Sequence, residues 1–99
     1  MNLQKMMKDL QKMQEKLQVE MDTLEVEASA GGGVVNARMN GKKELIALLL
    51  APESITPDDP ELLQDLILAA VNEAGRKVDL ELKRLTQGMA GGFRIPGLS

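Results

Sequence analysis

The first side chains in this sequence that could do chemistry are four lysines near the N-terminus. They are Lys5, Lys8, Lys12 and Lys16. On an α-helix, with about 100° per residue, this spacing places all four within about 80° of one another, in a row about 17 Å long. Ammonium groups in such a row can follow the phosphates of a nucleic acid, and they can equally form a solvated outer face. The spacing alone leaves both interpretations open.

A second set of cations lies toward the C-terminus and supplies further candidates for DNA contact. These residues are Arg76, Lys77, Lys83, Arg84 and Arg94. The first four form two pairs at a spacing of seven residues, so each pair would share a helix face. Asp79 and Glu81 lie close enough along the chain to pair with them, which is the alternative interpretation. Arg94 follows Phe93, the only aromatic residue in the chain.

Catalytic and metal chemistry find little support in the composition. The chain has no cysteine and no histidine, which removes thiolate nucleophiles, zinc thiolate sites and the commonest general base. The acidic residues of the middle segment fit no calcium-loop spacing. They include Glu25, Glu27, Asp58, Asp59 and Glu61. We therefore expect no enzyme, no cofactor, no metal site and no small-molecule substrate.

Charge is distributed unevenly along the chain. Residues 1–18 carry four lysines against two acids, whereas residues 19–75 carry eleven acids against three basic residues. Residues 76–99 are basic again, with five cations against two acids. Both ends could therefore face DNA while the acidic middle repels phosphate. The N-terminus has no signal-peptide pattern and no apolar run is long enough to span a membrane, so we expect a cytoplasmic protein without a membrane partner.

The N-terminal segment predicts an amphipathic helix from residue 3 to about 22. Leu3, Leu10, Leu17 and Leu24 recur every seven residues, and methionines lie beside them on the same face. Glu20 interrupts this apolar stripe, so the coiled-coil pattern is imperfect. The stripe either packs on its own domain or contacts a helix of a second subunit.

The middle of the chain predicts three short strands. Residues 24–30 alternate between apolar and polar types, residues 34–39 form a second strand, and residues 45–50 form a third. The glycine run at 31–33 connects the first two, and Asn40-Gly41 is a hairpin signal between the next two. Because the third strand is apolar on both faces, both faces should be covered.

The C-terminal part predicts a long helix from about residue 60 to 87. Asp59 is the expected N-cap, Pro60 the first helical residue and Gly88 the expected stop. The first half, residues 62–74, is apolar on most sides and should be buried. We expect one α+β domain over residues 1–89, with a helix, a three-stranded antiparallel meander and a second helix. Residues 90–99 should form a flexible tail containing glycine and proline.

A second subunit would supplement the core, which is thin and aliphatic in so short a chain. The expected contacts of this homodimer lie on the third strand and on the stripe of the first helix. They are Leu45, Ala47, Leu48, Leu49, Leu50, Leu10 and Leu17.

The ordered set of segments resembles the YbaB/EbfC family of bacterial nucleoid-associated proteins. The resemblance rests on Met6-Met7-Lys8 through Met13-Gln14-Glu15-Lys16, Ala30-Gly31-Gly32-Gly33-Val34-Val35, Asn40-Gly41-Lys42, residues 63–74 and the ending Gly91-Gly92-Phe93-Arg94-Ile95-Pro96-Gly97. It implies a tweezer-like homodimer with protruding helices that binds double-stranded DNA on the nucleoid, without catalysis. It implies a role in nucleoid organisation and gene regulation. The all-apolar run from Ala47 to Leu50 departs from the alternating strand usual in relatives.

Two other functions fit parts of the pattern. The order of helix, hairpin and helix also suits a prefoldin-like chaperone, whose clients would meet the methionine-rich stripe. The leucine heptads also suit a coiled-coil scaffold that binds a partner protein. The first helix is short for a chaperone tentacle. A DNA-binding experiment would distinguish both alternatives from the function that the family resemblance implies.

Overall fold

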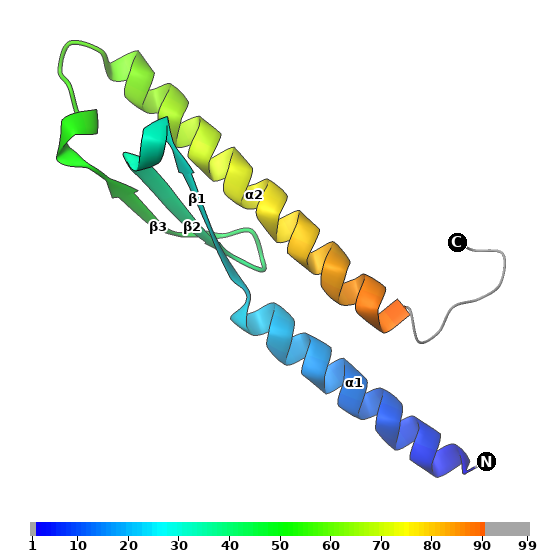
Figure 1. Cartoon of the computed structure of the whole chain (residues 1–99). Helices are drawn as coiled ribbons and strands as arrows, with labels where there is room; N and C mark the ends of the chain where they lie inside the picture. Colours follow the sequence, from blue (N-terminus) through cyan, green and yellow to red (C-terminus); the bar gives the residue numbers. More distant parts are fainter. Residues whose placement is uncertain (1, 91–99) are drawn as a thin grey trace, which may run out of the picture.

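The computed structural model describes residues 2–90, which form two long helices and one small sheet (Figure 1). The elements are α1 (Leu3–Thr23), β1 (Glu25–Ala30), β2 (Val35–Asn40), β3 (Leu45–Leu50) and α2 (Pro60–Ala90). Short 3₁₀ turns at Gly31–Gly33 and Pro52–Ser54 lie after β1 and after β3. The predicted α+β class is confirmed. The predicted tail from residue 91 onward, with Arg94, lies outside the described residues.

Helix α1 begins at a side-chain cap that the sequence analysis did not single out. The Asn2 Oδ1 atom accepts a hydrogen bond of 3.1 Å from the Gln4 amide, which satisfies one of the free N–H groups at the helix start. At the other end the chain turns into the extended conformation at Leu24, whose amide donates to the Met21 carbonyl oxygen. One residue, Leu24, therefore joins α1 to β1.

The three strands form an antiparallel meander in the order β1-β2-β3, with α2 packed on one face. Alternate residues of the sheet turn toward α2, so Ala28, Val35, Ala37 and Met39 are buried. Their counterparts on the helix, also buried, are Ala70, Ala74 and Val78. Because most of these side chains are small, the helix backbone can lie close to the sheet. This layer of contacts is the core of the chain.

Helix α2 begins as predicted but ends later. The Asp59 Oδ1 atom accepts a 3.1 Å hydrogen bond from the Leu62 amide, which confirms Asp59 as the N-cap before Pro60. The helix then continues through Gly88 to Ala90, so the predicted stop at Gly88 is wrong. A glycine inside a helix costs only about 1 kcal/mol relative to alanine, which does not force the helix to end.

The hairpin between β2 and β3 uses Asn40-Gly41 differently from a two-residue turn. The Lys43 amide donates to the Asn40 carbonyl oxygen at 3.0 Å, and Lys43 is the residue with a left-handed backbone, at φ 62°. The Asn40 side chain accepts hydrogen bonds from the amides of Lys42 and Glu44, each at 3.0 Å. Gly41 therefore does not supply the positive φ of this turn.

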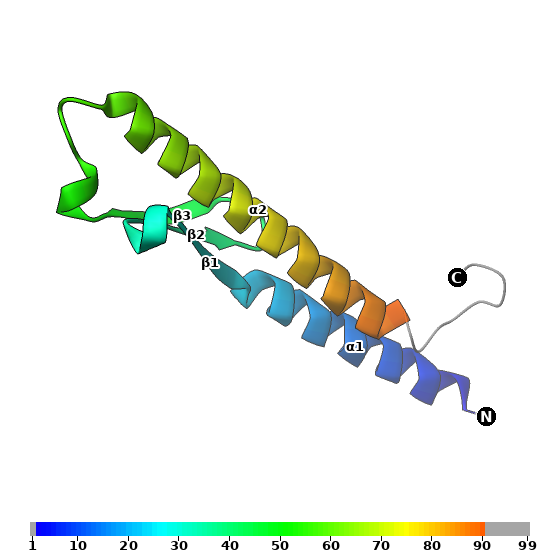
Figure 2. The same ribbon diagram turned by 45° about the horizontal axis from the view of Figure 1, so that its top comes forward.

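The chain is elongated, because both helices extend beyond the sheet. Its extents are 70 × 27 × 16 Å, and its radius of gyration is 19.4 Å; a compact domain of this length has about 13 Å. Figures 1 and 2 show α1 and the second half of α2 leaving the sheet from the same end, with antiparallel directions. We call residues 3–23 the α1 arm and residues 76–90 the α2 arm.

Two expectations about burial fail within a single chain. Leu62 and Leu68 of α2 are 53% and 59% exposed, although residues 62–74 were expected to be buried. The reason is that one small sheet covers only one side of the helix. On β3, Leu45, Ile46 and Leu49 are also exposed, so neither face of this strand is fully covered by the chain itself.

Candidate nucleic-acid interface

The four lysines of the predicted row lie on the α1 arm, and all are exposed to solvent. The α1 arm is one continuous helix, so the row keeps the common direction that its spacing predicts. Within residues 2–90, the basic partners of all salt bridges are Arg38, Lys43, Arg76 and Arg84. The ammonium groups of the lysine row (Lys5, Lys8, Lys12 and Lys16) therefore carry charge that no carboxylate of the described residues neutralises at close range.

The apolar stripe on the other side of α1 is largely uncovered. Leu3, Met6, Met7, Leu10 and Met13 are exposed, and Leu3 retains 72% of its surface. Leu17, further along the stripe, is half-buried, and α1 makes a small contact with α2. The N-terminal part of the stripe is thus not packed on its own domain, which favours a second helix as its partner.

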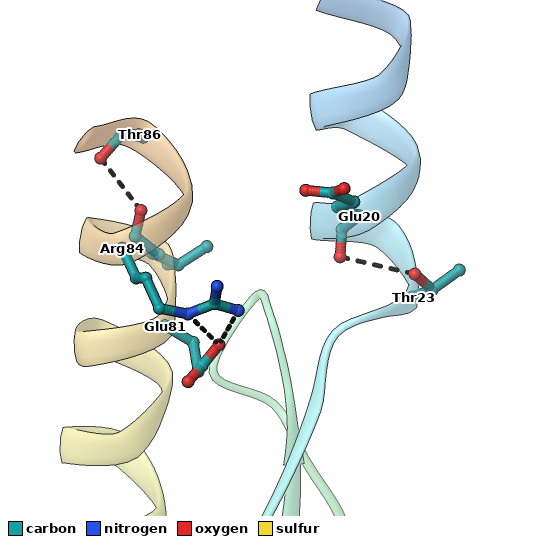
Figure 3. A network of polar contacts seen from close by, with 6 residues as sticks. Glu20, Thr23, Glu81, Arg84 and Thr86 are labelled. Carbon is teal, nitrogen blue, oxygen red and sulfur yellow. Dashed lines mark hydrogen bonds and ion pairs between the residues drawn. The ribbon is translucent and has the colours of Figure 1, made fainter. Parts of the chain in front are cut away.

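The two arginines of the α2 set are held by carboxylates of their own helix. Arg76 Nη2 lies 2.7 Å from Glu73 Oε2, and Arg84 Nη2 lies 2.7 Å from Glu81 Oε2. The hydrogen bond and charge of Glu81 raise the pKa of Arg84, and the charge of Glu20 on α1 acts in the same direction. Figure 3 shows Glu20 on the helix facing Arg84. Both guanidinium groups are therefore partly neutralised before any ligand arrives.

The two lysines of the same set differ from each other. Lys77 Nζ donates a 2.7 Å hydrogen bond to the carbonyl oxygen of Glu27, which ties it to the sheet. Lys83 is exposed on the α2 arm and takes part in none of the salt bridges within residues 2–90. Lys83 is therefore the cation of the α2 arm that most resembles the lysine row.

Two lysines that the sequence analysis did not assign to a site lie at the base of the arms. Lys42 and Lys43 belong to the β2–β3 hairpin, which adjoins the end of α1 and the middle of α2. Both lysines are exposed, and Lys43 Nζ lies 3.2 Å from Asp79 Oδ2. No local sequence pattern predicts where these two lysines lie, because their position depends on how the hairpin packs between two helices that are distant in the sequence.

Strand β3 is an edge strand of the sheet, with one side of its backbone unpaired within residues 2–90. In register it pairs Leu49 with Asn36 and Leu48 with Ala37, so Leu49 turns away from α2 while Leu48 turns toward it. Leu49 is 61% exposed, and Leu48 and Leu50 are half-buried against the core. The edge is thus both apolar and free to pair with another strand.

Acidic residues of the sheet and of the start of α2 lie away from the lysine row. Glu25 and Glu27 are on the exposed face of the sheet, where Arg38 Nε lies 4.0 and 3.3 Å from their carboxylates. Asp58, Asp59 and Glu61 are exposed at the start of α2, at the end of the molecule opposite the arms (Figure 1). The molecule therefore has an acidic end and an arm that carries the lysine row.

Among residues 2–90, no cluster of three or more acidic side chains could hold a metal ion. None of the helices described there combines the length and the apolar character needed to cross a membrane.

Comparisons with known proteins agree on one family. The model of the YbaB/EbfC DNA-binding family matches residues 1–93. A nucleoid-associated protein of Koribacter versatilis is 44% identical over 97% of this chain and 95% of its own length. A nucleoid-associated protein of Alkaliphilus metalliredigens is 48% identical over 97% of this chain and 81% of its own length. The crystal structure of an uncharacterized protein from Helicobacter pylori shares the fold, with a TM-score of 0.68 at 24% identity over 90% of this chain and 97% of that one.

Proposed function

We propose that this chain, which belongs to the YbaB/EbfC DNA-binding family, binds double-stranded DNA as a homodimer, mainly through contacts to phosphate. We further propose that it acts in the cytoplasm on the bacterial nucleoid and contributes to nucleoid organisation and gene regulation. The nucleoid part of this proposal follows from the names of its relatives.

The observation that carries the phosphate proposal is the exposed lysine row on a projecting helix. These ammonium groups stand outside the salt bridges formed within residues 2–90, whereas the arginines of α2 are paired. A cation without a carboxylate partner does not have to break an ion pair within the chain before it binds phosphate. Such contacts supply most of the sequence-independent affinity for DNA. We therefore assign the main contribution to the lysine row and a smaller one to Lys83 and the remaining cations of α2.

The homodimer proposal rests on apolar surface that one chain leaves open. β3 offers an unpaired edge, and Leu49, Leu45 and the N-terminal part of the α1 stripe are exposed. An exposed apolar edge strand promotes association, and a second copy can cover it symmetrically. Such a dimer would carry two pairs of arms, which gives the tweezer-like shape that the family resemblance implies.

A gel-shift experiment with unrelated duplexes across a salt series tests the DNA proposal. The logarithm of the affinity should fall with the logarithm of salt concentration, with a slope of about −0.9 for each phosphate contacted. Affinity should vary little among duplex sequences. A slope near zero would contradict the phosphate proposal, as would a preference for one sequence above about a thousandfold.

Light scattering at micromolar concentration tests the dimer separately. The expected mass is twice the 10.8 kDa of one chain, and a monomer would contradict the dimer proposal. Suppression of client aggregation in the absence of DNA binding would instead favour a chaperone.

A further inference from the structure

The β2–β3 hairpin (residues 41–44) is wedged between the bases of the two arms. On one side it meets the last turn of α1, and on the other it meets the middle of α2. The α1 arm is joined to the sheet only through Leu24 and makes few contacts with α2. The direction of the lysine row must therefore be set close to this junction.

Gly41 makes the contact on the α1 side, and the space there admits no side chain. A Cβ atom at Gly41 would lie 2.5 Å from the carbonyl oxygen of Met21 and 3.4 Å from the Cβ atom of Leu24. The Met21 oxygen belongs to the backbone of α1, so it cannot rotate away as a flexible side chain could. Because Gly41 does not have a positive φ, an alanine there would suffer no backbone strain and would act only through this contact.

Lys43 makes the contact on the α2 side. Its left-handed backbone turns the chain back into β3, and its Nζ atom reaches Asp79 Oδ2 at 3.2 Å. The Cε atom of Lys43 lies over Gly75 of α2, where an added Cβ would be 3.5 Å away, an ordinary van der Waals distance. The hairpin thus has a tight backbone contact with α1 and a more tolerant side-chain contact with α2.

We propose that Gly41 is a positioning residue for DNA binding, because its close approach to Met21 lets the hairpin set the angle between the α1 and α2 arms. The inference rests on the proposed function for its link to DNA, while the arm angle itself can be measured without DNA. Replacing Gly41 by alanine would push the Met21 oxygen back from 2.5 Å toward an ordinary contact distance. Because Gln11 lies about 15 Å further along α1, a small displacement at the base becomes a larger one there.

The angle can be measured between two spin labels on one chain. The sequence has no cysteine, so cysteines introduced at the exposed residues Gln11 and Thr86 can be labelled cleanly. Labelled chains diluted with an excess of unlabelled protein report distances within one subunit. Gly41→Ala should shift or broaden the distance distribution relative to the parent chain. Gly75→Ala, the same change on the tolerant side of the hairpin, should leave the distribution unchanged.

The DNA readout uses the same two variants, which do not change net charge. Gly41→Ala should weaken binding several-fold and reduce the salt slope, because fewer lysines of the row reach phosphates at the same time. Gly75→Ala should keep both the affinity and the slope. If Gly41 only stabilises the fold, Gly41→Ala would lower the melting temperature but leave the salt slope and the distance distribution unchanged. That result would overturn the proposal.

A variant on the α2 side of the β2–β3 hairpin covers the case in which Gly41→Ala does not fold. Lys43→Gln removes the contact to Asp79 and should broaden the same distance distribution, and an unchanged distribution would overturn the proposal. If instead the proposed function is wrong, the parent chain would not bind DNA. Its arm distances would still respond to these substitutions, so the two failures can be distinguished.

Discussion

The Nζ atom of Lys77 donates a 2.7 Å hydrogen bond to the carbonyl oxygen of Glu27, a residue fifty positions earlier in the chain. The contact fastens the long stem of Lys77 across the interface between α2 and β1. A lysine engaged in this way has to give up a protein contact before it can bind a phosphate. The neighbouring cation Lys83, further along the α2 arm, has no such contact to the backbone of the sheet within residues 2–90.

We therefore expect Lys77→Gln and Lys83→Gln to have different effects, although both remove one positive charge. Lys77→Gln should lower the free energy of unfolding by about 0.5–1 kcal/mol, the usual net value of one hydrogen bond, and change DNA affinity little. Lys83→Gln should weaken DNA binding more and leave stability unchanged. Urea denaturation and salt-dependent gel shifts measure the two quantities. Equal losses of DNA affinity would show that Lys77 reaches phosphate despite its contact with Glu27.

The lysine row can be separated from the paired arginines by two variants with the same change in charge. Lys5, Lys8 and Lys12 changed together to Gln should keep the circular dichroism of the parent chain, because these side chains are exposed and Gln is a good helix former. Their loss should weaken DNA binding at least about tenfold, or roughly 1.4 kcal/mol.

The matched control changes Arg38, Arg76 and Arg84 to Gln, since each of these arginines is already bound to a carboxylate. This variant should lose clearly less affinity than the lysine variant. If the two lose the same amount, binding follows net charge and the lysine row is not a distinct site. If neither loses affinity, the row is only a solvated face.

Leu49→Asp tests the dimer at β3. Leu49 is 61% exposed in a single chain, so a carboxylate there would be tolerated by a monomer. In a dimer that covers β3, the same carboxylate would be buried without a partner, which costs enough to dissociate the subunits. Light scattering should show a mass near 10.8 kDa for this variant. Ser29→Asp adds the same charge on the outward side of β1 and should stay dimeric; dissociation of both would point to charge rather than to the β3 contact.

The left-handed conformation of Lys43 predicts a stabilising substitution. A residue with a side chain at φ 62° costs roughly 1–2 kcal/mol more than glycine does. Lys43→Gly would also remove the ion pair with Asp79, so the comparison is best made in the Asp79→Asn variant, in which that pair is already absent. There we expect Lys43→Gly to raise the free energy of unfolding by up to about 1 kcal/mol, since glycine also loses more entropy on folding. Urea denaturation measures it, and a decrease would mean that the turn does not need this conformation.

Much of the fold could be predicted from patterns between neighbouring residues. The seven-residue spacing of Leu3, Leu10 and Leu17 predicted α1, and the alternation from Leu24 to Ala30 predicted β1. Asp59 before Pro60 predicted the start of α2, which the bond to the Leu62 amide confirms. The predicted end of α2 was wrong because a glycine such as Gly88 is only a weak local signal for the end of a helix. The lysine row is local as well, since a regular helix fixes the relative directions of residues three and four apart.

The tertiary structure decided which contacts these side chains make and which of them stay exposed. Only the packed chain shows that Lys77 is bound to Glu27, that Lys43 reaches Asp79, and that Gly41 lies against Met21 rather than supplying a left-handed turn. It also shows that the N-terminal part of the α1 stripe and the outward side of β3 are left uncovered. Periodicity arises from backbone geometry repeated every few residues, and the sequence carries it directly. Contacts between residues 20 to 50 positions apart depend on how complete helices and strands pack, and no short-range pattern contains that information.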